Sequence, residues 1–68
     1  MTELRIRLNG EEKQILQGDT ISKLVAEMGV TGRYAVELNG EIVPKSEHSS
    51  KQLVEADRIE IVQAIGGG

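Results

Sequence analysis

The chain has 68 residues, no cysteine, a single histidine and a net charge of −3, with an isoelectric point near 5.0. A domain this small is close to the lower limit for folding without staples, and the lack of cysteine excludes disulfides and thiolate metal sites. The acidic charge balance argues against nucleic acid as a partner, no apolar run is long enough to span a membrane, and we expect one cytoplasmic domain over residues 1–68.

The first part of the chain predicts a β-hairpin. Apolar and charged side chains alternate over Glu3–Leu8, which is the pattern of a half-buried strand. Asn9 and Gly10 follow, and this pair favours tight hairpin turns because both residues tolerate positive φ. Residues 11–17 would form the returning strand, with either Ile15 or Leu16 facing the core.

A short amphipathic helix is predicted next. Thr20 suits the N-cap, because its hydroxyl can accept a hydrogen bond from a free N–H of the first turn, and Gly29 suits the C′ position. The apolar residues between them recur at helical spacing and would form one buried stripe, made of Ile21, Leu24, Val25 and Met28. A helix this short needs a sheet to pack on.

The second half of the chain predicts a second hairpin and a final strand. Tyr34, Val36 and Leu38 would point inward from a strand over residues 34–38, and a turn at residues 39–40 would lead into a short strand over residues 41–43. Pro44 would end that strand or lie at an edge, since it has no N–H to donate. The polar segment 45–52 could hold a brief helical turn capped by Ser46, and Leu53 is expected in the core.

This order of elements indicates an α+β fold, in which a mixed sheet of about five strands carries one main helix on one face. The first and last strands can both be central and parallel, because the helix lies in the long crossover between the two halves. If they are neighbours, Arg5 and Arg7 would pair with Glu60 on the outer face of the sheet. An equally good alternative is that both arginines meet acidic groups on a partner.

The outer face of the last strand, predicted over residues 58–63, changes from charged to apolar toward the end of the strand. Ile59 and Ile61 share the core face, whereas Arg58, Glu60 and Val62 share the outer face. Isolated exposed aliphatic side chains are ordinary on monomers. We favour the alternative of a partner-binding patch, because interface cores are depleted in charge. The residues of this predicted patch are Val62, Ala64 and Ile65.

The chain finishes with three glycines, Gly66, Gly67 and Gly68, which predict a flexible tail over residues 65–68. Such a tail can be a frayed end. Glycine also threads narrow channels, and three extended residues reach roughly 10 Å. A free C-terminal carboxylate is ionised at neutral pH and is a poor electrophile, so it would need activation, for example as an acyl-adenylate. The chain has no phosphate-binding loop, and the activating chemistry would therefore belong to another protein.

The other polar side chains of interest have simpler interpretations. His48 lies in a polar segment and is expected to face solvent, because a lone histidine without partners seldom acts in catalysis. Asp19 and Asp57 are expected to be turn residues rather than metal ligands. We therefore expect no catalytic residue, no metal site and no cofactor, and hence a protein that is not an enzyme.

The segments 35–44 and 57–62, together with the terminal glycines, resemble the ThiS family of bacterial sulfur carriers for thiazole formation in thiamin biosynthesis. The resemblance extends over essentially the whole chain and implies a β-grasp, ubiquitin-like fold. It implies that a ThiF-like adenylyltransferase adenylates Gly68, and that a cysteine desulfurase or other donor supplies the sulfur of a terminal thiocarboxylate. ThiG, the thiazole synthase, would then take that sulfur. Gly67 would complete the di-glycine motif, and Gly66 would lengthen the tail.

Three alternatives remain open at this point. A MoaD-like carrier for molybdopterin synthesis would share the tail chemistry, although such chains tend to be longer and to contain phenylalanine, which is absent here. A ubiquitin-like modifier would instead form isopeptide bonds to lysines. A non-catalytic ubiquitin-like interaction module would have an inert tail.

Overall fold

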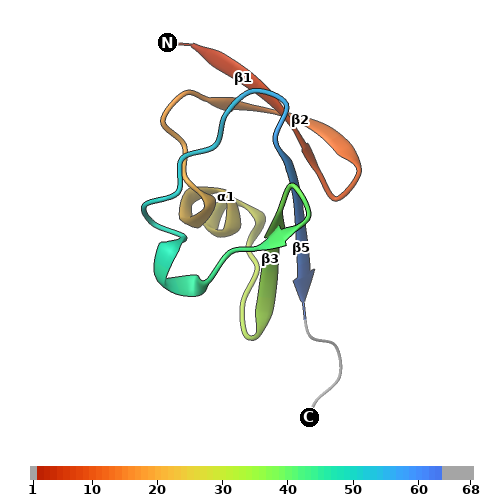
Figure 1. The fold of residues 1–68 in the computed structure, drawn as a ribbon, viewed down its shortest axis with the longest axis vertical. Helices are drawn as coiled ribbons and strands as arrows, with labels where there is room; N and C mark the ends of the chain where they lie inside the picture. The colour runs from red at the N-terminus through yellow and green to blue at the C-terminus, as the bar shows by residue number, and fades with distance from the viewer. Residues whose placement is uncertain (1, 64–68) are drawn as a thin grey trace.

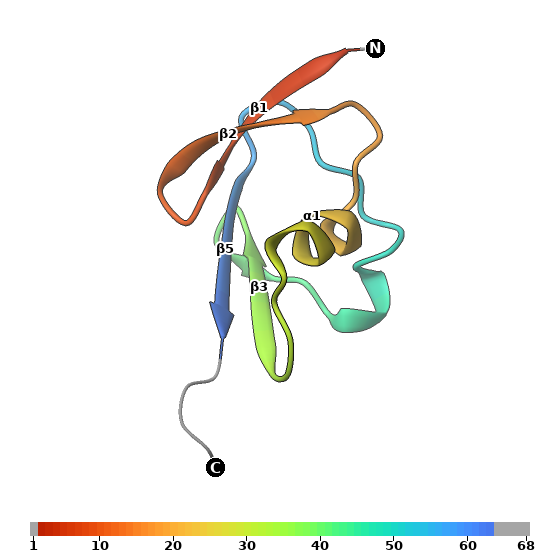
Figure 2. The same ribbon diagram turned by 180° about the vertical axis from the view of Figure 1, so that it is seen from behind.

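The computed structural model describes residues 2–63, and it has a mixed five-stranded sheet with one helix against one face (Figures 1 and 2). The strand order is β2-β1-β5-β3-β4, with β1 and β5 parallel and the other neighbours antiparallel. The elements are β1 (Glu3–Leu8), β2 (Glu11–Leu16), α1 (Ile21–Met28), β3 (Tyr34–Leu38), β4 (Glu41–Ile42), a 3₁₀ turn η1 (Lys45–Glu47) and β5 (Arg58–Gln63). The predicted α+β architecture, with neighbouring parallel terminal strands, is confirmed.

The core between helix and sheet is aliphatic. Its buried members come from every layer of the fold and are Ile6, Ile15, Ile21, Leu24, Val25, Val36, Leu38, Leu53 and Ile59. Ile15 rather than Leu16 is the inward residue of β2, and Leu53 is buried as expected. Tyr34 packs partly buried against this cluster. The alternation in the sequence therefore assigned the inward faces of the strands correctly.

Helix α1 begins and ends at the predicted residues. The Thr20 hydroxyl accepts a hydrogen bond from the Lys23 N–H at 3.2 Å, and Gly29 has a left-handed backbone with φ of 71°. The prediction that Met28 completes the buried stripe is wrong, since Met28 is 38 % exposed. It is the last helical residue, directly before the left-handed C-cap Gly29.

Asp19 stabilises the entry to this helix as a turn residue, as predicted. Its carboxylate accepts from the Leu16 N–H at 3.1 Å and from the Lys23 ammonium at 3.1 Å. The backbone hydrogen bond, followed by the bond to Lys23, lowers the pKa of Asp19 below its ordinary value of 3.8. The ionised form of this side chain is thus the one that the folded state favours.

A pH dependence of stability results from that lowered pKa. The contribution of Asp19 to the free energy of unfolding should be fully present above pH 3.8, the ordinary pKa of its side chain. It should be lost as the pH falls through the lower pKa of the folded state. We expect Asp19→Asn to be less stable than the wild type at pH 7, with the difference narrowing in this acidic range. Urea unfolding across pH 2–7 measures it. The exposed Glu12→Gln serves as control, and an equal pH response of both variants would contradict the assignment.

The expectation that His48 faces solvent is wrong. His48 is only 5 % exposed, its Nε2 lies 3.0 Å from the Val43 carbonyl oxygen, and its ring is 6.0 Å from that of Tyr34. Its backbone carbonyl also accepts from the Ser22 N–H, near the start of α1. The side chain thus joins the segment after β4 to the core, which gives it a structural position.

Two further expectations about polar contacts are also wrong. Ser46 does not cap η1, because Pro44 occupies the N-cap position and makes no side-chain hydrogen bond there. Arg5 pairs with Glu12 on the neighbouring strand at 3.9 Å, and Arg7 donates to the Gly10 carbonyl. Neither arginine forms an ion pair with Glu60 among residues 2–63. The reason is the register: Leu8 is opposite Ile59, so Glu60 lies beyond the end of β1.

Candidate functional site

Strand β5, which leads to the tail, has two different faces. Ile59 is fully buried and Ile61 packs partly buried against the core. Arg58, Glu60 and Val62 point to the opposite face, where Val62 is 61 % exposed. The predicted alternation is confirmed. Of the predicted partner-binding residues, Val62 alone is within the described residues; Ala64, Ile65 and the three glycines lie outside them.

Val62 belongs to a small apolar group on the outer face of the sheet. Ala35 of β3 is directly opposite it and is exposed. Ile42 of β4, which is 63 % exposed, lies on the same face opposite Glu37. Ile42 is the diagonal neighbour of Ala35 and lies two strands away from Val62. We call Ala35, Ile42 and Val62 the outer-face patch.

Charged residues border the outer-face patch on one side. A shallow depression of about 210 Å³ is lined by side chains of both signs, namely Arg7, Glu37, Arg58 and Glu60. Glu37 and Glu60 are directly opposite each other in the β3–β5 ladder, an arrangement that costs some stability because like charges repel. Among residues 2–63, no cluster of three or more His, Cys, Asp or Glu side chains could hold a metal ion.

Two asparagines hold β5 in place, a role that the sequence reasoning missed. Asn9 Oδ1 accepts from the Ile61 N–H at 2.8 Å, and Asn39 Oδ1 accepts from the Arg58 N–H at 2.8 Å. Both have positive φ in their hairpin turns, at 51° and 53°. The signal available in the sequence was the repetition of Asn-Gly at the two hairpins that flank β5 in the sheet.

Asp57 completes this support at the start of β5. Its carboxylate accepts from the Asn39 side-chain amide at 3.0 Å and from the Val54 N–H at 2.8 Å, and the residue is buried. The prediction that Asp57 is a turn residue is confirmed. Side chains from both flanking hairpin turns therefore bond to the backbone of β5, at Arg58 and at Ile61.

The sequence model of the ThiS family matches residues 6–68, nearly the whole chain. The chain belongs to the ThiS family. This ThiS-family chain is 42 % identical over 66 residues to a protein named thiazole synthase from Paramagnetospirillum magneticum, and 36 % identical over 66 residues to one of the same name from Magnetococcus marinus. Each alignment includes 96 % of the chain but only 20 % of the relative. The chain thus spans about a fifth of the length of these relatives.

Solved structures show the same fold. The crystal structure of the thiamine biosynthesis protein ThiS from Geobacter metallireducens superposes with a TM-score of 0.74 at 23 % identity, covering 96 % of this chain and all of that one. The solution structure of a thiamine biosynthesis protein from the same organism gives a TM-score of 0.76 at 22 % identity, with 96 % and 88 % covered. The predicted β-grasp fold of this ThiS-family chain is thereby confirmed. No helix within residues 2–63 is long and apolar enough to cross a membrane.

Proposed function

We propose that this chain is a sulfur carrier whose C-terminal Gly68 is adenylated and then converted to a thiocarboxylate, which donates sulfur for thiazole formation in thiamin biosynthesis. The observation that carries the proposal is the ThiS family match, which runs to Gly68 and includes all three glycines of the tail. The bonds of Asn9 and Asn39 to β5 agree with it, because a carrier needs a fixed base from which to present its reactive end.

The proposed chemistry takes place at one carboxyl group. A carboxylate oxygen of Gly68 attacks the α-phosphorus of ATP on a ThiF-like adenylyltransferase, and pyrophosphate leaves. Sulfide-level sulfur then attacks the acyl carbon of the adenylate, and AMP leaves with one of the original carboxylate oxygens. Persulfide sulfur from a cysteine desulfurase would first give an acyl disulfide, which a thiol reductant must cleave to release the thiocarboxylate. The carrier chain supplies the acyl group, and catalysis belongs to its partners. Gly66 and Gly67 supply reach without side chains.

The named relatives favour a thiazole synthase as the acceptor. In two bacterial proteins of that name, a segment similar to this chain makes up a fifth of the length. One polypeptide that joins such a segment to a larger part would hold a carrier close to the enzyme that consumes its sulfur. We therefore infer that this chain serves a ThiG-like thiazole synthase rather than a molybdopterin synthase.

Intact-mass analysis tests the proposal directly. The full chain is incubated with the adenylyltransferase of the same genome, ATP and a sulfide source. We expect the mass to rise by the difference between a sulfur and an oxygen atom, with fragmentation locating the change at Gly68. An unchanged mass, alongside a demonstrably active adenylyltransferase, would refute the sulfur-carrier proposal. Transfer of the sulfur to ThiG but not to molybdopterin synthase then distinguishes the two carrier functions.

The outer-face patch is the proposed docking surface for these partners. Replacing Val62 by Asp should raise the KM for the carrier in adenylation by about tenfold or more, since an unpaired charge would be buried in an interface. Stability should fall by no more than about 1 kcal/mol, the range of strand propensities, because Val62 is exposed. Adenylation kinetics and urea unfolding measure the two effects.

Val54→Asp provides a matched control for this prediction. Val54 is 59 % exposed, close to the exposure of Val62, but lies in the loop before β5 rather than on the outer face of the sheet. The same substitution there should leave the KM unchanged. An equal rise in KM for both variants would show a general charge effect, and a collapse of stability in Val62→Asp would show that Val62 is part of the core.

A further inference from the structure

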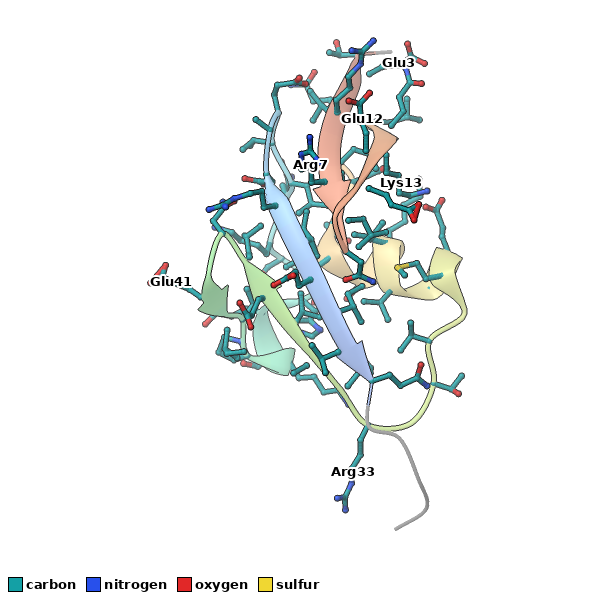
Figure 3. All side chains as sticks on the ribbon, turned by 90° about the vertical axis from the view of Figure 1, so that its right-hand side faces the viewer. Glu3, Arg7, Glu12, Lys13, Arg33 and Glu41 are labelled. Carbon is teal, nitrogen blue, oxygen red and sulfur yellow. The ribbon has the colours of Figure 1, made fainter. Side chains whose placement is uncertain are left out.

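One edge of β5 is without a neighbouring strand over its last residues. Strand β1 pairs with β5 only as far as Leu8 opposite Ile59, whereas β5 continues to Gln63. Figure 3 shows the ribbon of β5 running on past the end of β1. On the other side, β3 pairs with β5 along its whole length, up to Tyr34 opposite Gln63. In the part of the chain that the structure describes, no strand pairs with the edge of β5 facing β1 beyond Ile59, and we call this stretch the open edge.

The hydrogen bonds show which backbone groups point to this edge. The Arg7 N–H donates to the Asp57 carbonyl, and the Asn9 N–H donates to the Ile59 carbonyl, both at 2.9 Å. Successive residues of a strand point their backbone groups to alternate sides. The N–H and C=O groups of residues 57, 59, 61 and 63 therefore face β1, and those of residues 58, 60 and 62 face β3.

Asn9 ends the ladder between β1 and β5 with its side chain. In a parallel ladder, the residue whose N–H bonds to Ile59 would accept from the Ile61 N–H with its own carbonyl. Asn9 already belongs to the hairpin turn, with a φ of 51°. Its side-chain Oδ1, instead of its backbone carbonyl, accepts from the Ile61 N–H at 2.8 Å. The next two groups along the edge are the Ile61 carbonyl and the Gln63 N–H, one acceptor and one donor that flank Val62.

We propose that an extended segment of the adenylyltransferase binds this open edge, with one of its residues donating to the Ile61 carbonyl and accepting from the Gln63 N–H. A single residue of a parallel strand forms this pair of bonds. An antiparallel partner would instead bond to both backbone groups of one residue, and at Ile61 the Asn9 side chain already occupies the N–H. The pair formed by the Ile61 carbonyl and the Gln63 N–H therefore fits a short parallel segment that extends the line of β1.

The short distance between this edge and Gly68 points to the adenylyltransferase as the partner that binds the edge. This assignment rests on the proposed function. Gly68 comes five residues after Gln63, a span of at most about 17 Å when fully extended. A partner that holds Gly68 in its adenylating site consequently lies within that distance of the edge. Val62, at the end of the outer-face patch, lies between the two backbone groups, so one partner surface can contact both. Pairing there would fix the direction in which the tail leaves the sheet.

A proline substitution tests the donor at this edge. Gln63→Pro removes the N–H that faces the partner and leaves the bonds to β3 in place, since residue 63 directs its backbone groups away from β3. The substitution also removes the side-chain amide, which donates to the Thr31 carbonyl at 2.8 Å. Gln63→Ala removes that amide alone and is the matched control. We expect the KM for adenylation to be about 3- to 10-fold higher for Gln63→Pro than for Gln63→Ala.

Amide hydrogen exchange of the wild-type chain gives a second readout that needs no variant. Upon saturation with the adenylyltransferase, the Gln63 N–H should exchange about tenfold more slowly or slower still, whereas the Ile61 N–H, already bonded to Asn9, should change little. An unchanged Gln63 exchange rate, or equal KM values for the two variants, overturns the inference while adenylation of the wild type leaves the proposed function standing. A wild-type chain that is never adenylated overturns both.

Discussion

Deletion of Gly68 is expected to abolish thiocarboxylate formation while leaving the fold intact. The shortened chain still ends in two glycines, so the loss would come from reach rather than from the di-glycine motif. One residue withdraws the carboxylate by about 3.5 Å, and misplacement of a reacting atom by even 1 Å can slow a reaction on the order of 100-fold. Intact-mass analysis after incubation with the adenylyltransferase, ATP and sulfide measures the loss.

Gly66→Ala is the length-matched control for this deletion. It differs from the shortened chain by a single alanine before the same two glycines, and it restores the position of the terminal carboxylate. We expect it to retain most of the activity. Full activity of the shortened chain would show that the motif suffices and that reach is irrelevant. Both chains should unfold at the wild-type temperature, because the described core is formed by residues 6–59; a much lower temperature for the deletion would contradict the separation of fold from function.

The same loss is expected when one alanine is added after Gly68. The added residue carries the carboxylate past the position of activation and places a Cβ in a channel that glycine is suited to enter. Neither the shortened nor the lengthened chain should therefore form the thiocarboxylate in the intact-mass assay. If the lengthened chain were modified as fast as the wild type, the terminal residue would not be the feature that its partner recognises.

Much of this fold was predictable from the sequence because its signals are local. The alternation over residues 58–63 placed Ile59 and Val62 on opposite faces, and Thr20 and Gly29 marked the ends of the helix. Each of these signals depends on neighbours only a few residues away. The structure agrees with them, except at Met28, where the periodic pattern continues to a helix end that the core does not cover.

Two of the predictions that were wrong depended on contacts that the local sequence does not show. His48 was expected to face solvent because its neighbours in sequence are polar, yet the turn after β4 directs its ring toward Val43 and Tyr34. The pairing of Arg5 or Arg7 with Glu60 depended on the register between β1 and β5, which no local pattern reveals.

The candidate site was predictable in part for the same reason. The outward position of Val62 follows from alternation, whereas the bonds from Asn9 and Asn39 to β5 join residues that are 52 and 19 positions apart. An Asn-Gly pair predicts a hairpin through its backbone preference, but says nothing of what the side-chain oxygen will accept. The open edge beyond Asn9 could therefore be recognised only once the strands were placed side by side.

Replacement of Ile59 by Ala is expected to have the largest effect on stability among single changes in β5. Ile59 is fully buried in the central strand, between β1 and β3. Truncation of such a side chain removes buried apolar surface and leaves a cavity, at a typical cost of about 2–5 kcal/mol. A single core in a domain of this size supplies only about 3–5 kcal/mol of net stability. The variant should therefore be largely unfolded at 37 °C, as measured by circular dichroism and urea titration.

Val62→Ala is the matched control, because it shortens an aliphatic side chain three residues later on the opposite face of the same strand. It should change the free energy of unfolding by no more than about 0.5 kcal/mol, as is usual for exposed positions. Its effect should instead fall on partner binding, if the outer-face patch is the docking surface. Similar losses of stability at residues 59 and 62 would contradict the two-faced assignment of β5. A large loss at Ile59 alone would separate the residues that hold the strand in the sheet from those that present it to a partner.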